Sequence, residues 1–167
     1  MHVRLAHTND LTRLLEIINS VYRGEDSKKN WTTEAHWIEG LRIQLPELQH
    51  YLDNKTFTLL VLEEGNVLLG CVKLEIEDDG RVFLGLLTVS GDKQKVGLGK
   101  FLVRAAEKYT LEKLGCNDLH MMVLSNRPEL LAWYERQGYQ DTSQRRPWLE
   151  SWGPTTVPLE FKIMRKG

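Results

Sequence analysis

Hydrophobic residues recur along this chain with two periods, one typical of strands and the other typical of helices. Short runs rich in β-forming residues predict strands at 2–6, 56–63, 67–77, 81–89, 119–124 and within 155–167. Apolar residues at helical spacing predict helices from Thr8 or Asn9 to Tyr22, over 97–114, and from Ser125 or Asn126 to Gly138. The run 81–89 is nearly continuous in apolar residues, which indicates a central strand buried on both faces.

The segment between the first helix and the second strand is less regular. A second helix is expected to begin at Thr32 or Thr33 and to be interrupted by Pro46. Its apolar face would contain Ala35, Ile38 and Leu41. A loop over 142–154 is expected to lead into the last strand. The resulting order, β-α-α-β-β-β-α-β-α-β, predicts a mixed α/β domain.

Length and charge restrict the class of protein. At 167 residues the chain is long enough for one domain with a full core. Its formal net charge of -1 gives no electrostatic argument for binding nucleic acid or an anionic membrane. No apolar run approaches the roughly 20 residues that span a bilayer, and residues 1–10 lack the apolar core of a signal peptide, so a cytoplasmic protein is expected.

Metal chemistry has no support in the sequence. The five histidines are scattered and form no HExxH motif. Cys71 and Cys116 form no CxxC pair and no cluster with metal-ligand spacing. We therefore expect free thiols and no metal.

A glycine-rich turn, QKVGLG at 94–99, separates the predicted strand 81–89 from the helix that follows. Glycine lets the backbone turn tightly and come close to a ligand. The first turn of the helix presents unpaired N–H groups and the positive end of the helix dipole, so an anion is favoured there. Lys93, Lys95 and Lys100 add positive charge. The turn is a candidate phosphate site, although ordinary helix entry uses the same residues.

Two common phosphate loops do not fit this turn. A P-loop, G-x-x-x-x-G-K-S/T, requires a hydroxyl residue after Lys100, and Phe101 stands there. The dinucleotide fingerprint G-x-G-x-x-G/A requires a small residue where Leu102 stands. Both alternatives are therefore excluded by a named residue.

The pattern that fits is R/Q-x-x-G-x-G/A, which resembles the coenzyme A pyrophosphate loop of the GNAT family of N-acetyltransferases. Gln94, Gly97 and Gly99 stand at the matching positions. The segment 123–139 resembles a second family pattern, N-x-x-A-x-x-x-Y-E/K-K/R-x-G-F/Y. Its matching residues are Asn126, Tyr134, Glu135, Arg136, Gly138 and Tyr139, with Leu130 and Leu131 near the usual small residue. With the N-terminal strand and helices, the likeness extends over essentially the whole chain.

The resemblance implies a fold. Residues 1–167 would form a single GNAT-type acyl-CoA N-acyltransferase domain of the α/β (α+β) class. Its central sheet would be mixed and mostly antiparallel, with about six to seven strands and about four flanking helices. The fourth and fifth strands would splay apart, and the pantetheine arm of acetyl-CoA would lie between them like an added strand.

The resemblance also implies cofactor contacts. The strand edge would contribute Leu87, Thr88 and Val89, whose backbone can bind the amide-rich arm while their side chains pack in the core. The remaining contacts would come from Gln94, Lys95, Val96, Gly97, Leu98, Gly99, Lys100 and Asn126. A backbone N–H at Thr88 or Val89 would stabilise the charge that develops on the acyl oxygen.

Tyr134 matches the family tyrosine that lies near the coenzyme sulfur, which implies that it protonates the leaving thiolate. An alternative interpretation is a packed aromatic residue beside Leu130 and Trp133 on an amphipathic helix. The family position resolves this choice in favour of the acid.

The general base has no such match. Several family members carry a glutamate early in the fourth strand, and Phe83 stands there in this chain. Glu75, Glu77 or His120 could instead relay a proton through water, although each is also compatible with a surface position.

The acceptor pocket is expected between the loop after the first helix and the loop before the last strand. Trp31 lies in the former loop, and Trp148 and Trp152 lie in the latter beside Arg145 and Arg146. Such aromatic residues can hold a small amine, anchor a loop on the core, or form a subunit contact in a homodimer.

The leading hypothesis is an N-acetyltransferase that uses acetyl-CoA on a primary amine of a small molecule, an amino-acid derivative or a protein, by direct attack in a ternary complex. A second hypothesis, which Phe83 allows, is a catalytically silent module that binds acyl-CoA. An interaction domain without a cofactor is disfavoured by the intact loop 94–99.

Overall fold

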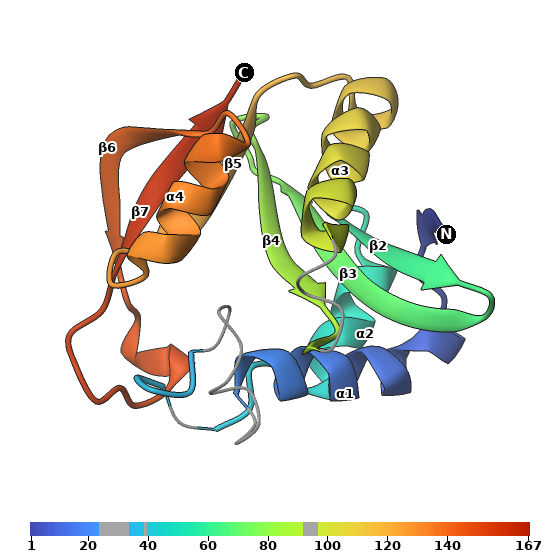
Figure 1. Ribbon diagram of the computed structural model, residues 1–167, viewed down its shortest axis with the longest axis horizontal. Helices are drawn as coiled ribbons and strands as arrows, with labels where there is room; N and C mark the ends of the chain where they lie inside the picture. The colour runs from blue at the N-terminus through green and yellow to red at the C-terminus, as the bar shows by residue number, and fades with distance from the viewer. Residues whose placement is uncertain (24–33, 39, 92–96) are drawn as a thin grey trace.

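The computed structural model describes residues 1–23, 34–38, 40–91 and 97–167. Its centre is a seven-stranded sheet in the order β1-β2-β3-β4-β5-β7-β6, antiparallel except for the parallel pair β4 and β5 (Figure 1). The strands are β1 (His2–Leu5), β2 (Phe57–Glu64), β3 (Val67–Ile76), β4 (Val82–Val89), β5 (Leu119–Leu124), β6 (Gln140–Pro147) and β7 (Glu160–Lys166). The helices are α1 (Leu11–Tyr22), α2 (Leu45–Asp53), α3 (Leu98–Leu114) and α4 (Pro128–Arg136). The mixed α/β class expected from the sequence is confirmed.

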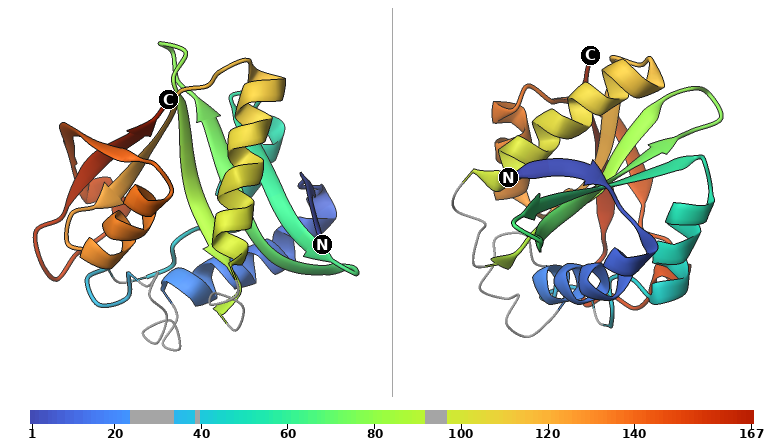
Figure 2. Two further views of the ribbon diagram at one scale, coloured as in Figure 1. Left: turned by 45° about the horizontal axis from the view of Figure 1, so that its top comes forward. Right: turned by 90° about the vertical axis from the view of Figure 1, so that its right-hand side faces the viewer.

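Two apolar clusters lie on opposite faces of the sheet. One cluster joins α1 and α2 to β2 and β3 through residues such as Leu14, Leu48 and Val61. The other joins α3 and α4 to β3, β4 and β5 through residues such as Leu102 and Met121. Helices α3 and α4 therefore share one face, the front in Figure 1, and Figure 2 shows α1 and α2 from two further sides. In this arrangement α1 and α3 both contact β4, and the last residue of α1, Tyr22, bonds to Leu87 near the end of β4.

Strand β4 contains a bulge that changes the direction of its side chains. Gly85 pairs with Lys73 and Thr88 pairs with Cys71, so β4 has one more residue than β3 between these two pairs. Leu86 has a left-handed backbone with φ of 52°. As a result Leu84 packs in the cluster with α3, whereas Leu86 packs in the cluster with α1.

Strands β4 and β5 pair only along their first residues. The parallel register joins Val82–Leu84 to Leu119–Met121. Beyond these residues the two strands diverge, as Figure 1 shows, so the expected splay of the fourth and fifth strands is confirmed. The bulge at Leu86 and Leu87 begins two residues past the last pair, which places it inside the split.

The helix expected from Thr32 or Thr33 is wrong over its described residues. Residues 35–37 form a turn, and Ile38 forms an isolated β-bridge with Thr155. The helix of this region is α2, and Pro46 lies in its first turn, where the missing N–H of proline costs nothing. Apolar spacing alone did not separate this turn from a helix.

The loop expected over 142–154 is also partly wrong. Residues 140–147 form β6, a seventh strand that pairs with β7 at the edge of the sheet. Because most side chains of β6 are polar and exposed, the hydrophobic pattern of the sequence does not reveal this strand. No helix in the described ranges is long and apolar enough to cross a membrane.

Candidate active site

A cavity of about 920 Å³ lies along the split between β4 and β5. Its wall includes Leu87 and Val89 of β4, Gly99 of α3 and Tyr134 of α4. These residues come from segments far apart in the sequence, and the splay of the sheet brings them to one space. The volume lies in the range of ligand sites in proteins.

The backbone of β4 after the bulge faces this cavity at alternate residues. The Ser90 N–H donates to the Leu69 carbonyl at 2.8 Å, and the Thr88 carbonyl lies against Gly70, so both groups face β3. Backbone groups alternate along a strand, and those of Leu87 and Val89 therefore face the split. This edge has the form that binds an extended, amide-rich ligand.

Tyr22, at the end of α1, is tied to this edge. Its phenol donates a hydrogen bond to the Leu87 carbonyl. Burial is the largest cause that raises the pKa of Tyr22 to about 12, so the phenol remains a donor at neutral pH. Tyr22 also lines the cavity.

The start of α3 meets the same cavity. Gly97 precedes the helix with φ of 78°, a left-handed conformation that glycine adopts without strain. Gly99 lines the cavity, and a Cβ there would lie 3.5 Å from Cζ2 of Trp133. The first N–H groups of α3 lie at this end of the helix, where the helix dipole favours an anion.

Tyr134 lies in the wall of the cavity with only 6% of its surface exposed. Its ring contacts Trp133 and Tyr139 edge to face, with centroids 5.0 and 5.9 Å away. Burial is the main cause that raises its pKa well above the ordinary value, followed by the neighbouring Tyr22. The phenol therefore keeps its proton over the whole physiological range.

A family model decides how this chain is related to known proteins. The model described as the Acetyltransferase (GNAT) family matches residues 11–139. The chain belongs to the GNAT family. The comparison with curated proteins gave no match.

Solved structures with the same fold come from several acetyltransferases. The ribosomal-protein-alanine N-acetyltransferase of Brucella melitensis is 21% identical, with a TM-score of 0.74 over 99% of each chain. The yncA protein of Salmonella typhimurium, solved with its cofactor acetyl-CoA, is 18% identical, with a TM-score of 0.74 over 99% of this chain and 92% of that chain. The spermidine N-acetyltransferase of Vibrio cholerae, solved with CoA and spermine, is 19% identical, with a TM-score of 0.69 over 99% and 94%. At these identities the likeness shows the fold.

Not every residue expected to bind the cofactor lies at the cavity. Leu87, Val89 and Gly99 line it, whereas Thr88 turns its side-chain hydroxyl to the Leu86 carbonyl at 2.9 Å. Gly97, Leu98 and Lys100 lie at the start of α3 beside Gly99. Four of the expected site residues, Trp31, Gln94, Lys95 and Val96, lie outside the described residues.

The second family pattern is displaced by one residue in this GNAT chain. The pattern puts its tyrosine seven positions after its asparagine, but Tyr134 follows Asn126 by eight (126 to 134), so Arg127 occupies that place. Arg127 is 4% exposed and lines the cavity. Asn126 is not among the described lining residues, and its buried side-chain amide has no hydrogen-bond partner within the described structure. A cofactor contact by Asn126 stays a prediction.

The three candidate bases differ in their access to the cavity. Glu75 and Glu77 line it, and Phe83 lines it between them and β5. Glu77 is held by Arg81 at 3.4 Å and by Arg146 at 3.6 Å. Glu75 lies 3.4 Å from the Lys73 ammonium.

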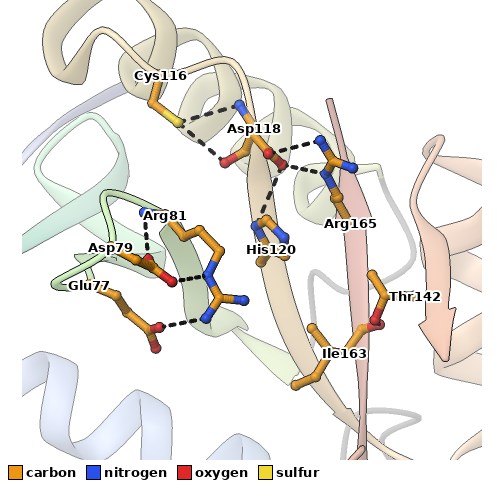
Figure 3. Close-up of polar contacts among 9 residues, drawn as sticks. All are labelled: Glu77, Asp79, Arg81, Cys116, Asp118, His120, Thr142, Ile163 and Arg165. Atoms are coloured by element: carbon orange, nitrogen blue, oxygen red, sulfur yellow. Dashed lines mark hydrogen bonds and ion pairs between the residues drawn. The ribbon is translucent and has the colours of Figure 1, made fainter. Parts of the chain in front are cut away.

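His120 is the third candidate base, and it lies at the closed end of the β4–β5 split. Figure 3 shows its ring beside Asp118, which binds Arg165. Burial lowers the pKa of His120, so it is neutral at physiological pH. It stacks on Phe83 with ring centroids 5.4 Å apart and is not among the described residues that line the cavity.

The far wall of the cavity is aromatic. Trp148, Trp152 and Phe161 all line it, and the Trp148 ring stacks on Phe161 at 5.9 Å. Trp148 is fixed by a hydrogen bond from its indole N–H to the Gly153 carbonyl at 3.1 Å. The Arg146 guanidinium lies 5.1 Å from the centre of the Phe83 ring, so this wall continues to β4.

In the described parts of the chain, no group of three or more His, Cys, Asp or Glu side chains could hold a metal ion.

Sequence reasoning did not identify the polar residues that converge on the cavity. Tyr22 was assigned only to the apolar face of a helix, and Lys73, Arg42 and Arg127 were not singled out. Lys73 gave no signal in the sequence, because only the packed structure shows that its side chain, 16% exposed, lies 4.5 Å from the centre of the Tyr51 ring. The sequence did contain a signal for Arg127, because it stands seven positions before Tyr134, where the family pattern has its asparagine.

Proposed function

We propose that residues 1–167 form a single acyltransferase domain that transfers the acetyl group of acetyl-CoA to a primary amine in a ternary complex. The observation that carries the proposal is Tyr134, a buried phenol in the wall of a cavity that follows the split between β4 and β5. GNAT membership and neighbours that are N-acetyltransferases support it. The acceptor is an amine of a small molecule, an amino-acid derivative or a protein.

The residues at the split fit a coenzyme A arm. The cavity-facing backbone of Leu87 and Val89 would bind the arm as an added strand, and the start of α3 at Gly97–Gly99 would hold the pyrophosphate. When bound, acetyl-CoA supplies an acetyl thioester as the acyl donor. The protein holds the two reactants together, which itself contributes much of the rate enhancement.

Tyr134 holds a proton at its phenol oxygen for the leaving sulfur. Because its pKa is raised, the phenol keeps this proton until the thiolate leaves. The acceptor ammonium must lose a proton before its nitrogen can attack, and Glu75 and Glu77 are the candidate acceptors that line the cavity. Of the two backbone N–H groups expected to stabilise a developing oxyanion, that of Thr88 lies on the side of β3, so the role would fall to Val89 on the cavity side.

A thermal-shift titration with acetyl-CoA tests the proposal. Acetyl-CoA at about 100 times its Kd should stabilise the protein by roughly 2.7 kcal/mol. A panel of primary amines should then release free thiol only when both reactants are present. No shift with any acyl-CoA would contradict the proposal and the silent module together, whereas binding with no turnover over a broad panel would favour the silent module, which Phe83 at the usual base position allows.

The pH dependence follows from the state of Tyr134. An acid must be protonated to act, and a raised pKa extends its protonated range upward. The acceptor amine gains its reactive neutral form as pH rises toward about 10. We expect kcat/KM to rise from roughly pH 6 to 10 with no descending limb from Tyr134. A descending limb below pH 10 that disappears in Tyr134→Phe would contradict this assignment.

A further inference from the structure

One carboxylate is shared by two arginines at the edge of the cavity. Glu34 Oε1 lies 3.5 Å from Arg23 Nε and 3.6 Å from Arg42 Nε. The side chains of Arg23 and Glu34 are 6% and 9% exposed, and burial lowers the pKa of Arg23. These three residues, here called the arginine pair and its glutamate, carry a net charge of +1 in a largely desolvated place. Such a charge favours an anion.

Arg42 is the member of this group that a ligand can reach. Its side chain is 31% exposed and lines the cavity. Its guanidinium lies 5.6 Å from the centre of the Tyr22 ring. Among the described residues, Glu34 is the only carboxylate that forms an ion pair with it. A planar guanidinium placed in this way matches a carboxylate with two parallel hydrogen bonds.

The other carboxylates among the described residues that line the cavity already have partners. Glu75 lies 3.4 Å from Lys73, Glu77 lies 3.6 Å from Arg146, and Glu47 accepts a 2.7 Å hydrogen bond from the Tyr51 phenol. The described residues that line the cavity include five basic side chains and four acidic ones. The basic residues are Arg23, Arg42, Lys73, Arg127 and Arg146, and the acidic residues are Glu34, Glu47, Glu75 and Glu77. Among these described residues the cations exceed the carboxylates by one, which does not favour a polycationic acceptor.

The group lies next to the edge where the reaction would occur. Arg42 lies over the ring of Tyr22, and the phenol of Tyr22 binds the carbonyl of Leu87 in the bulge. Tyr22 thus connects the arginine pair to the cavity-facing edge of β4 through one side chain. Arg127, near Tyr22 and Tyr134, adds a further positive charge on the same side.

We infer that the acceptor carries a carboxylate and that Arg42 binds it. The substrate class is a free amino acid or a small amino-acid-like molecule, with its amine directed to the β4 edge. This inference rests on the proposed function and names its acceptor. Glu34 positions Arg42, and Tyr22 fixes the distance from Arg42 to the reacting edge.

The test compares matched acceptors on the wild type and on Arg42→Gln. L-amino acids and their carboxamides form the pairs, with spermidine as a polycation, and free thiol is measured at saturating acetyl-CoA. For the wild type, kcat/KM for the acids should exceed that for the amides by about tenfold or more. In Arg42→Gln the KM for the acids should rise by about tenfold, while that for the amides changes little. Arg42→Lys should retain part of the preference because it keeps the charge.

Arg13→Gln is the matched control. Arg13 lies on the exposed side of α1, with its side chain 56% exposed and paired with Glu16 at 3.0 Å. The variant makes the same change in charge and should leave the preference for acids unchanged. Thermal unfolding of each variant verifies that it is folded.

Three results would overturn the inference. The first is equal kcat/KM for acids and amides, or faster turnover of spermidine, in a wild type that uses acetyl-CoA. The second is a rise in the KM for acetyl-CoA in Arg42→Gln, which would assign Arg42 to a phosphate of the cofactor. The third applies if acetyl-CoA does not bind and the proposed function fails: an L-amino acid that stabilises the wild type and Arg42→Gln equally would then overturn it.

Discussion

Tyr134→Phe is expected to lower kcat by about 100-fold, because a positioned acid typically contributes at least this factor. The substitution removes one oxygen from a ring that is 6% exposed and packed against Trp133 and Tyr139, so the packing is preserved. The Kd for acetyl-CoA should change little, since in the proposed complex the arm would be bound by backbone groups of β4. Steady-state kinetics and a thermal-shift titration on the same preparation separate the two quantities.

Tyr139→Phe provides the control for this prediction. Tyr139 is 1% exposed and contacts the Tyr134 ring, but its phenol donates to Glu107 at 3.1 Å and it is not among the described residues that line the cavity. Loss of that hydrogen bond should cost about 1 to 2 kcal/mol of stability without an effect on kcat. If kcat in Tyr134→Phe equals the wild-type value, Tyr134 is not the acid.

Gly70→Ala is the substitution with the largest expected effect on stability. A Cβ at Gly70 would lie 2.2 Å from the Thr88 carbonyl oxygen and 3.2 Å from the Val89 Cα, both of them backbone atoms of β4. A backbone cannot rotate away as a side chain does, so β3 and β4 must separate next to the bulge. We expect a loss of about 3 kcal/mol in the free energy of unfolding, measured by urea denaturation.

The Gly70→Ala variant should also bind the acyl donor, acetyl-CoA, more weakly. The displaced residues include Val89, whose backbone faces the cavity, so the KM for acetyl-CoA should rise at temperatures where Gly70→Ala remains folded. Gly85→Ala is the control for stability, because its Cβ would meet only the flexible Lys73 side chain at 3.5 Å. Its free energy of unfolding should stay within about 1 kcal/mol of the wild-type value. Equal stability of the two variants would show that β3 and β4 approach less closely than the structure indicates.

Local patterns predicted most of the elements in this chain. The apolar period located α1 and α3, and the run 81–89 was correctly assigned to a central strand. The errors share one cause. In 34–38 and in β6 the structure depends on pairing with a distant segment, Thr155 in one case and β7 in the other. A hydrophobic period does not report such pairing.

The candidate site shows the same division. The glycine-rich turn and Tyr134 could be recognised as local patterns, because each is a fixed spacing on one helix or at one helix start. The bulge of β4 could not, since it appears only as an extra residue relative to the register of β3. The contact between Tyr22 and Leu87 joins residues 65 positions apart. This contact forms only because α1 packs on the sheet.

The sequence by itself therefore predicted most of the helices and strands in their order, without β6, as well as the resemblance to the GNAT family and the position of the phenol in α4. Those properties depend on residues close together in the chain. Only the tertiary structure decided that the pairing of β4 with β5 ends at Leu84, that Thr88 does not line the cavity beside Leu87 and Val89, and that Arg23 and Arg42 share Glu34 at its edge. The physical reason is that charges and backbone groups from distant segments acquire their partners only when the sheet and helices pack.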